Sequence, residues 1–228
     1  NYNGSQFSEH TELENVQVTA VHEFFHAIQF SYNCYERFWF MEATAVWSED
    51  ELYNNVNDHY RYISSWFSNI NKSLDDESSH MYGSFIFFQY IDEHLGGPNT
   101  IRLCWEKSHE LASPIQDNSI ESINAALSDL GSSFEETYLR MRIANKIMNM
   151  NAGLYSYEEA DGYRSAGGYP LEKDIFYQKG IPQEDTYLSL DLFETIYYKI
   201  HTSDPVKIEI IPYGNNLFMT SIAKLKDQ

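Results

Sequence analysis

The chain has 228 residues and a net charge of −19, and 43% of its residues are hydrophobic. This hydrophobic share argues against a disordered chain, and the length allows one large domain or two small ones. The negative charge argues against a nucleic-acid partner, because binding a phosphate backbone requires clustered lysines and arginines. No apolar run reaches the roughly eighteen residues that a membrane-spanning helix needs, so we expect no such span.

Apolar residues recur with helical spacing along most of the first two thirds of the chain. The spacing predicts helices at Thr11–Phe30, Phe38–Leu52, Asp58–Phe67, Ser79–His94, Asn99–Leu111, Ser119–Leu130 and Ser133–Met150. Two consecutive glycines and a proline, beginning at Gly96, are typical of a helix end and would stop the fourth of these.

The pattern changes in the last third. Residues 151–184 are rich in glycine, proline and tyrosine, which indicates a loop. The segments Thr195–His201, Val206–Pro212 and Leu217–Lys224 are rich in strand-forming residues and are separated by turn sequences. Short turns join antiparallel strands, so we expect a small antiparallel sheet. The predicted fold class is α+β, with a mainly helical domain at residues 1–175 and a small β region at residues 176–228.

The strongest chemical signal is the sequence His-Glu-x-x-His within the first predicted helix. His22 and His26 are four positions apart, so helical geometry places both imidazoles on one face, where they can bind one ion. Zinc accepts neutral imidazole nitrogen, and three protein ligands leave one position for water. Glu23 follows the first histidine, where it can take a proton from that water.

A third ligand is expected from the second helix. Glu42 is an isolated carboxylate among apolar residues, and metal coordination would remove the cost of burying it. Glu49 and Asp50 lie in a charged run and fit a solvent-facing side of the helix better. Glu49 is also a candidate to accept a hydrogen bond from the second nitrogen of a zinc-bound histidine, because it lies two turns after Glu42.

A histidine pair followed by a glutamate on a second helix resembles the gluzincin group of zinc peptidases, which includes thermolysin and the aminopeptidase-N-like enzymes. The latter carry Trp-x-x-Glu-Gly-x-Ala at the third ligand, and residues 39–45 here read Trp-Phe-Met-Glu-Ala-Thr-Ala. The chain departs from this pattern with Ala43 in place of glycine and with a short interval between His26 and Glu42. The stretch from His22 to Glu106 also resembles a family of predicted secreted bacterial metalloproteases.

The resemblance implies a zincin-like catalytic domain, a Zn²⁺ cofactor, a peptide or protein substrate and a secreted or extracellular location. It also implies a donor for the oxyanion of the tetrahedral intermediate. Aminopeptidase-N-like enzymes place a tyrosine three positions before a helix glycine, and thermolysin-like enzymes use a histidine. His80 lies three positions before Gly83, so it is the favoured donor, with Tyr82 as the alternative.

Two functions stay open at this point. The presence of Glu23 favours a zinc peptidase. Gluzincins usually carry a sheet before the metal helix, and the residues before His22 contain no convincing strand, which favours a catalytically inactive zincin-like binding module of a secreted or surface protein.

Other residue types give weaker signals. Cys34 and Cys104 would either pair or serve as small buried apolar residues. The histidines at positions 10, 59, 94, 109 and 201 lie in polar sequence contexts, so they are interpreted as surface residues. The oligomeric state has no signal in the sequence.

Overall fold

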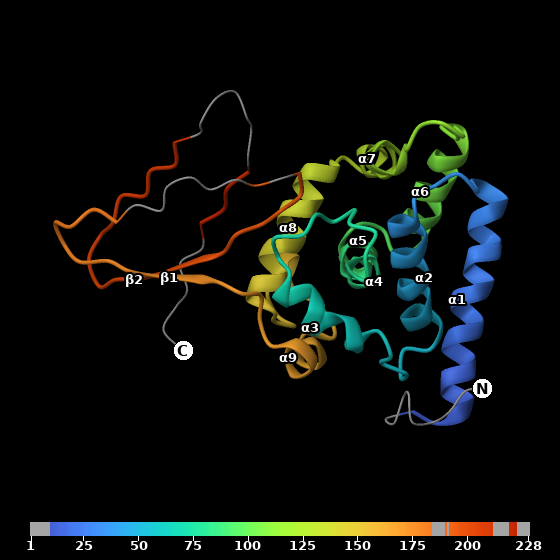
Figure 1. Cartoon of the computed structure of the whole chain (residues 1–228), viewed down its shortest axis with the longest axis horizontal. Helices are drawn as coiled ribbons and strands as arrows, with labels where there is room; N and C mark the ends of the chain where they lie inside the picture. Colours follow the sequence, from blue (N-terminus) through green and yellow to red (C-terminus); the bar gives the residue numbers. More distant parts are fainter. Residues whose placement is uncertain (1–9, 184–189, 191, 212–218, 223–228) are drawn as a thin grey trace.

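A body of helices makes up most of the molecule, and a two-stranded sheet extends from one side of it (Figure 1). The computed structural model describes residues 10–183, 190, 192–211 and 219–222. The helices are α1 (Glu12–Tyr32), α2 (Phe38–Leu52), α3 (Tyr60–Ser68), α4 (His80–Gly83), α5 (Phe85–His94), α6 (Pro98–Glu110), α7 (Ser119–Asp129), α8 (Phe134–Ile147) and α9 (Ala160–Gly167), with a 3-10 turn at Gly153–Tyr155. The strands are β1 (Lys173–Phe176) and β2 (Tyr198–His201).

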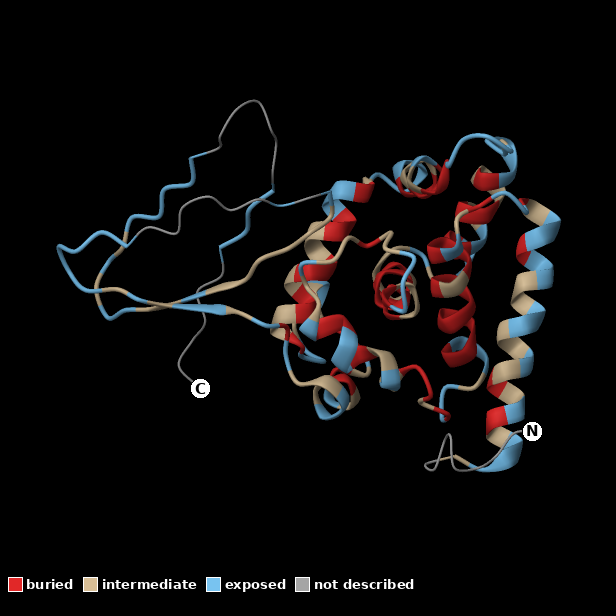
Figure 2. Cartoon of the chain, viewed as in Figure 1, coloured by how far each residue is buried: buried red, intermediate tan, exposed pale blue. Residues whose placement is uncertain are grey.

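Helix α2 is the centre of the helical body. It packs against α1, α4 and α5, and it is buried along nearly its whole length (Figure 2). Every residue from Trp39 to Asp50 is buried except Glu42. A helix that is covered on all sides belongs to a core, so the position of α2 follows from its nearly continuous apolar sequence.

The helix predictions for the first two thirds of the chain are confirmed, with small shifts at the ends. Helix α1 begins where the sequence offers a capping box: the Glu14 N–H donates to Thr11 Oγ1 at 3.2 Å, and the Thr11 N–H donates to the Glu14 carboxylate at 2.7 Å. The helix predicted at Ser79–His94 is interrupted at Ser84, whose hydroxyl donates to the Leu74 carbonyl at 2.8 Å. The interruption separates α4 from α5.

The predicted antiparallel sheet is wrong. β1 and β2 pair in parallel, with Lys173 opposite Tyr198 and Phe176 opposite His201. β1 lies in the segment that was interpreted as a loop, and so do α9 and the 3-10 turn. Residues 206–211 form no strand, while much of the segment predicted at Leu217–Lys224 lies outside the described residues. The prediction paired neighbouring segments, whereas a parallel partner must come from a distant one.

The expected domain boundary between residues 175 and 176 falls within β1, and the division itself stays a prediction. Within the described ranges, no helix is both long and apolar enough to cross a bilayer. Cys34 is exposed, Cys104 is buried, and both are free thiols. Burial raises the pKa of Cys104 to about 12.

Candidate metal centre

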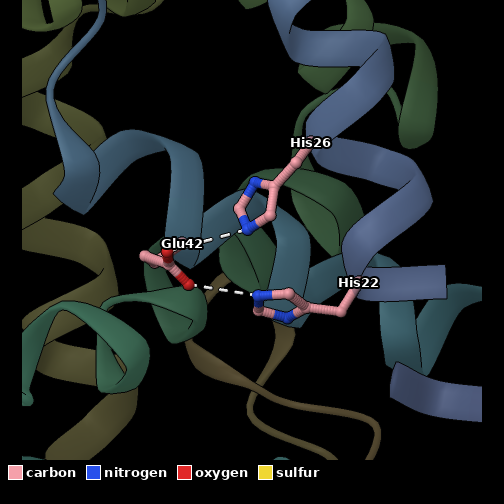
Figure 3. Close-up of side chains that lie close together, drawn as sticks. All are labelled: His22, His26 and Glu42. Atoms are coloured by element: carbon pink, nitrogen blue, oxygen red, sulfur yellow. Dashed lines mark hydrogen bonds and ion pairs between the residues drawn. The ribbon is translucent and has the colours of Figure 1, made fainter. Parts of the chain in front are cut away.

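Helices α1 and α2 bring the three predicted metal ligands together. His22 and His26 project from α1 with ring centroids 4.8 Å apart, and Glu42 projects toward them from α2 (Figure 3). The Glu42 carboxylate lies 3.1 Å from His22 Nε2 and 3.6 Å from His26 Nε2. Glu42 is only partly buried, unlike its neighbours on α2, because its side chain faces the two histidines and not the core.

The three side chains fit a zinc ion. One ligand atom from each lies within 4.8 Å of the others. Ligands bound tetrahedrally at about 2.0–2.2 Å from zinc are separated by about 3.4 Å, which lies between the two observed separations. Two imidazoles and one carboxylate are also a donor set typical of catalytic zinc sites, which keep a fourth position open.

Hydrogen bonds fix the orientation of both imidazoles. His22 Nδ1 lies 2.6 Å from Glu49 Oε1, and His26 Nδ1 lies 2.7 Å from Gln29 Oε1. The Gln29 amide in turn donates to the Met41 carbonyl at 2.8 Å. With each Nδ1 engaged in this way, each Nε2 is directed at Glu42. Such outer partners usually set the tautomer and the direction of a ligating histidine.

These contacts confirm Glu49 as the partner of His22 and correct its predicted exposure. Glu49 and Asp50 are both buried, whereas the sequence placed them on a solvent face. The prediction took a charged run to indicate a solvent-facing side, but this run lies on a helix that is covered on all sides. Gln29 was missed, although its place three residues after His26 on the same helix was an available signal.

The electrostatics of the site favour a cation. Burial disfavours charge on His22, but its hydrogen bonds with Glu42 and Glu49 outweigh burial and raise its pKa to about 9. Burial also raises the pKa of Glu49, against the effect of His22. Two carboxylates therefore hold a positive charge at His22, and a metal ion on the Nε2 nitrogens would replace the proton there.

The other predicted catalytic residues lie in different surroundings. Glu23 is exposed on α1 beside His22. Tyr82 is partly buried and stacks on Tyr62 with ring centroids 5.2 Å apart. Burial raises the pKa of Tyr82, and the carboxylates of Glu42 and Glu23 add to this effect. The Tyr82 hydroxyl therefore stays protonated in the field of the candidate centre.

His80 lies deep in the protein. It is 2% exposed, its ring stacks on Trp66 at a centroid distance of 4.5 Å, and neither ring nitrogen has a hydrogen-bond partner. Burial lowers its pKa to about 4, with a further contribution from the charge of Arg142. The packing of α4 on α3 explains this position, since a Cβ at Gly83 would lie 3.1 Å from Trp66 Cβ.

The prediction that five other histidines lie on the surface is partly wrong. His109 is exposed, and three others are partly exposed: His10, His94 and His201. His59 is fully buried. Its polar sequence neighbours gave no sign of this, because the side chains that cover it come from distant segments, among them Phe85 and Tyr163.

The model of DUF6055, a protein family of unknown function, matches residues 4–126, which is more than half of the chain. The chain belongs to this family. The matched region contains the candidate metal ligands, Glu23, Glu49 and Tyr82. No curated protein matches the chain, and neither does any solved structure. Family membership thus assigns no activity, and the function must be argued from the site.

A first prediction concerns the carboxylate behind His22. Glu49→Gln keeps an oxygen that can accept from the imidazole but removes the negative charge that strengthens this contact, so zinc affinity at the centre formed by His22, His26 and Glu42 should fall about 10–100-fold. Competition with a chromophoric chelator measures the affinity. The Glu42→Gln variant, which lacks one of the three candidate ligands, shows how much of the measured affinity belongs to this centre. Glu51→Gln is the matched control, because Glu51 is exposed two positions away. Equal affinities for the parent and Glu49→Gln would contradict the assigned contact.

A second prediction concerns buried His80. The unfolded chain protonates this histidine near pH 6.5 and the folded protein only near pH 4. Uptake of a proton by the unfolded state thus lowers the free energy of unfolding as the pH falls through this range, by up to about 3 kcal/mol. Buried carboxylates such as Asp50, whose pKa is raised by burial to about 6, act in the opposite direction.

The comparison with a variant isolates the histidine. His80→Phe keeps an aromatic ring on Trp66 and removes the titrating group. Between pH 7 and pH 4, the free energy of unfolding of His80→Phe, measured in urea, should therefore fall less than that of the parent. A constant difference between His80→Phe and the parent over this range would show that the histidine does not titrate as stated.

Proposed function

We propose that the chain is a zinc-dependent peptidase of the gluzincin type. The observation that carries the proposal is the convergence of His22, His26 and Glu42, with Glu23 beside the first histidine and exposed to solvent. A purely structural zinc site has no use for Glu23 and usually fills all four positions with protein ligands. The proposal includes export from the cell, as the resemblance implies, and detection of the protein in culture medium would test that part.

The residues of the chain divide the chemistry among them. Zinc bound to His22, His26 and Glu42 would lower the pKa of its water to about 7 and polarise a substrate carbonyl. Glu23 takes the proton of the attacking water and delivers it to the leaving amine. Glu49 and Gln29 hold the imidazoles in place during the reaction.

We assign the oxyanion contact to Tyr82 in preference to His80. Glu42 and Glu23 act on the Tyr82 hydroxyl, and its raised pKa keeps it able to donate a hydrogen bond. The charges that act on His80 come instead from Arg142, Asp76 and Lys72. A donor must face the place where negative charge develops, and of the two residues Tyr82 has the surroundings of the metal centre.

The alternative is a zincin-like binding module without turnover. The two strands in the described part of the chain, β1 and β2, both follow α9, so no described strand before α1 is available to align a peptide. The outer face of α1 also leaves large apolar side chains in solvent, with Phe24 69% exposed and Leu13 66% exposed. Such a face suits a protein partner as well as a substrate.

Glu23→Gln separates the two functions. Because Glu23 is not a ligand, the variant should bind zinc as tightly as the parent and should lose peptide hydrolysis by about 10²–10⁴-fold. A quenched fluorescent peptide library measures hydrolysis with and without a chelator, and Glu12→Gln, an exposed glutamate of the same helix, is the control. Parent protein that binds zinc but cleaves nothing would support the binding module.

Tyr82→Phe tests the oxyanion assignment. Because the contact forms mainly in the transition state, kcat should fall about 10²–10³-fold with little change in KM. Tyr62→Phe is the control: it removes the hydroxyl from the ring that stacks on Tyr82 and should lower kcat much less. A large decrease in kcat for His80→Phe together with a small one for Tyr82→Phe would show that His80, and not Tyr82, is the oxyanion donor.

A further inference from the structure

A second group of metal-ligating side chains lies where three helix ends meet. Asp50 lies in the last turn of α2, His59 is the residue that precedes α3, and Glu159 is the residue that precedes α9. The packing of α9 against α3 is close, since a Cβ at Gly167 would lie 2.8 Å from the Ser64 nitrogen. This contact brings Glu159 to a histidine one hundred positions earlier in the chain.

The three side chains lie close together, with one carboxylate at each ring nitrogen of His59. His59 Nε2 lies 3.1 Å from Glu159 Oε2, and His59 Nδ1 lies 3.7 Å from Asp50 Oδ1. One ligand atom from each residue lies within 4.8 Å of the others. Ligands of one tetrahedral ion are about 3.4 Å apart, so shifts of about 1 Å would bring both carboxylates onto an ion at one nitrogen of His59.

Hydrogen bonding accounts for only one side of the group, where His59 Nε2 and Glu159 Oε2 form a hydrogen bond at 3.1 Å. His59 is fully buried and Asp50 is 5% exposed, yet neither His59 Nδ1 nor Asp50 Oδ1 has a hydrogen-bond partner. Their separation of 3.7 Å is too long for a hydrogen bond. Buried polar atoms left in this state cost free energy, and a cation bound between them would satisfy both.

The surroundings supply negative charge and keep His59 and Asp50 away from water, while Glu159 is partly exposed. Burial raises the pKa of Asp50 to about 6; His59 opposes the shift, and the charges of Glu159, Glu51 and Glu158 add to it. Three aromatic rings pack edge-on against the imidazole of His59, from Tyr60, Phe85 and Tyr163. A cation held here would offset the repulsion among the carboxylates within an apolar shell.

We propose that Asp50, His59 and Glu159 form a second site, for a divalent transition-metal ion such as zinc. One imidazole with two carboxylates favours zinc, iron or manganese over calcium or magnesium. The three ligands come from the ends of three helices, so the ion ties α2 to α3 and α9. Because α2 also carries Glu42 and Glu49, the ion anchors the helix that supplies ligands to the first centre.

Counting bound zinc in the purified full chain tests the second site. After removal of metal with a chelator, saturation with zinc and gel filtration, the parent should retain two zinc ions per chain. Glu42→Gln should retain the ion of the second site, and His59→Gln should retain only the ion of the first. Glu158→Gln, an exposed neighbour of Glu159, should retain both.

Two further variants test the site even if His59→Gln fails to fold. Asp50→Asn and Glu159→Gln keep the shape of the side chains, and each should lose one ion while its circular dichroism spectrum stays that of the parent. Zinc should raise the melting temperature of Glu42→Gln, in which the second site is the only one left, and should not raise that of Glu42→Gln/Glu159→Gln.

The outcomes separate this site from the proposed function, on which it does not rest. If Glu42→Gln retains no zinc, or if Glu159→Gln retains as much as the parent, the second site does not exist and His59 is only an ion-pair partner of Glu159. Inactivity of the parent toward peptides would count against the peptidase and leave the second site untouched. A parent that retains a single ion lost in His59→Gln would support the second site and overturn the first.

Discussion

The burial of α2 is the constraint from which the rest of the site follows. This helix carries Glu42, Glu49 and Asp50 into or beside a core made largely of aromatic and aliphatic side chains. A carboxylate removed from water is costly unless a cation or hydrogen-bond donors compensate for it. Each of the three faces a histidine: Glu42 and Glu49 face His22, and Asp50 faces His59.

The two carboxylates that share His22 show how one helix fixes the position of a candidate metal ligand. Glu42 and Glu49 are seven positions apart, which is two turns, so they lie on the same side of α2. The imidazole fits between them, with Nδ1 at Glu49 and Nε2 at Glu42. Glu49 orients the ring, and Glu42 lies at the nitrogen that would bind the proposed ion, so the direction of this nitrogen is set without an ion. Preorganisation of this kind raises metal affinity.

The contrast between His22 and His80 shows how surroundings decide what a histidine can do. His22 has carboxylates at both nitrogens, and its pKa rises to about 9. His80 has an indole ring against its face and a nearby arginine, and its pKa falls to about 4. An imidazole without partners, held against Trp66, is favoured in its neutral form, while the ring between two carboxylates is favoured in its positively charged form.

The sequence by itself determined the features that depend on residues near one another in the chain. Helical spacing placed His22 and His26 on one face, and apolar periodicity located most helices. The sequence also indicated Glu42 as a ligand, because Glu42 is the single carboxylate among apolar neighbours. Only the tertiary structure decided that Glu49 and Asp50 are buried, that His59 meets Glu159, and that β1 pairs in parallel with β2. These features depend on contacts between segments far apart in the chain, and local periodicity carries no information about which distant side chains will cover a residue.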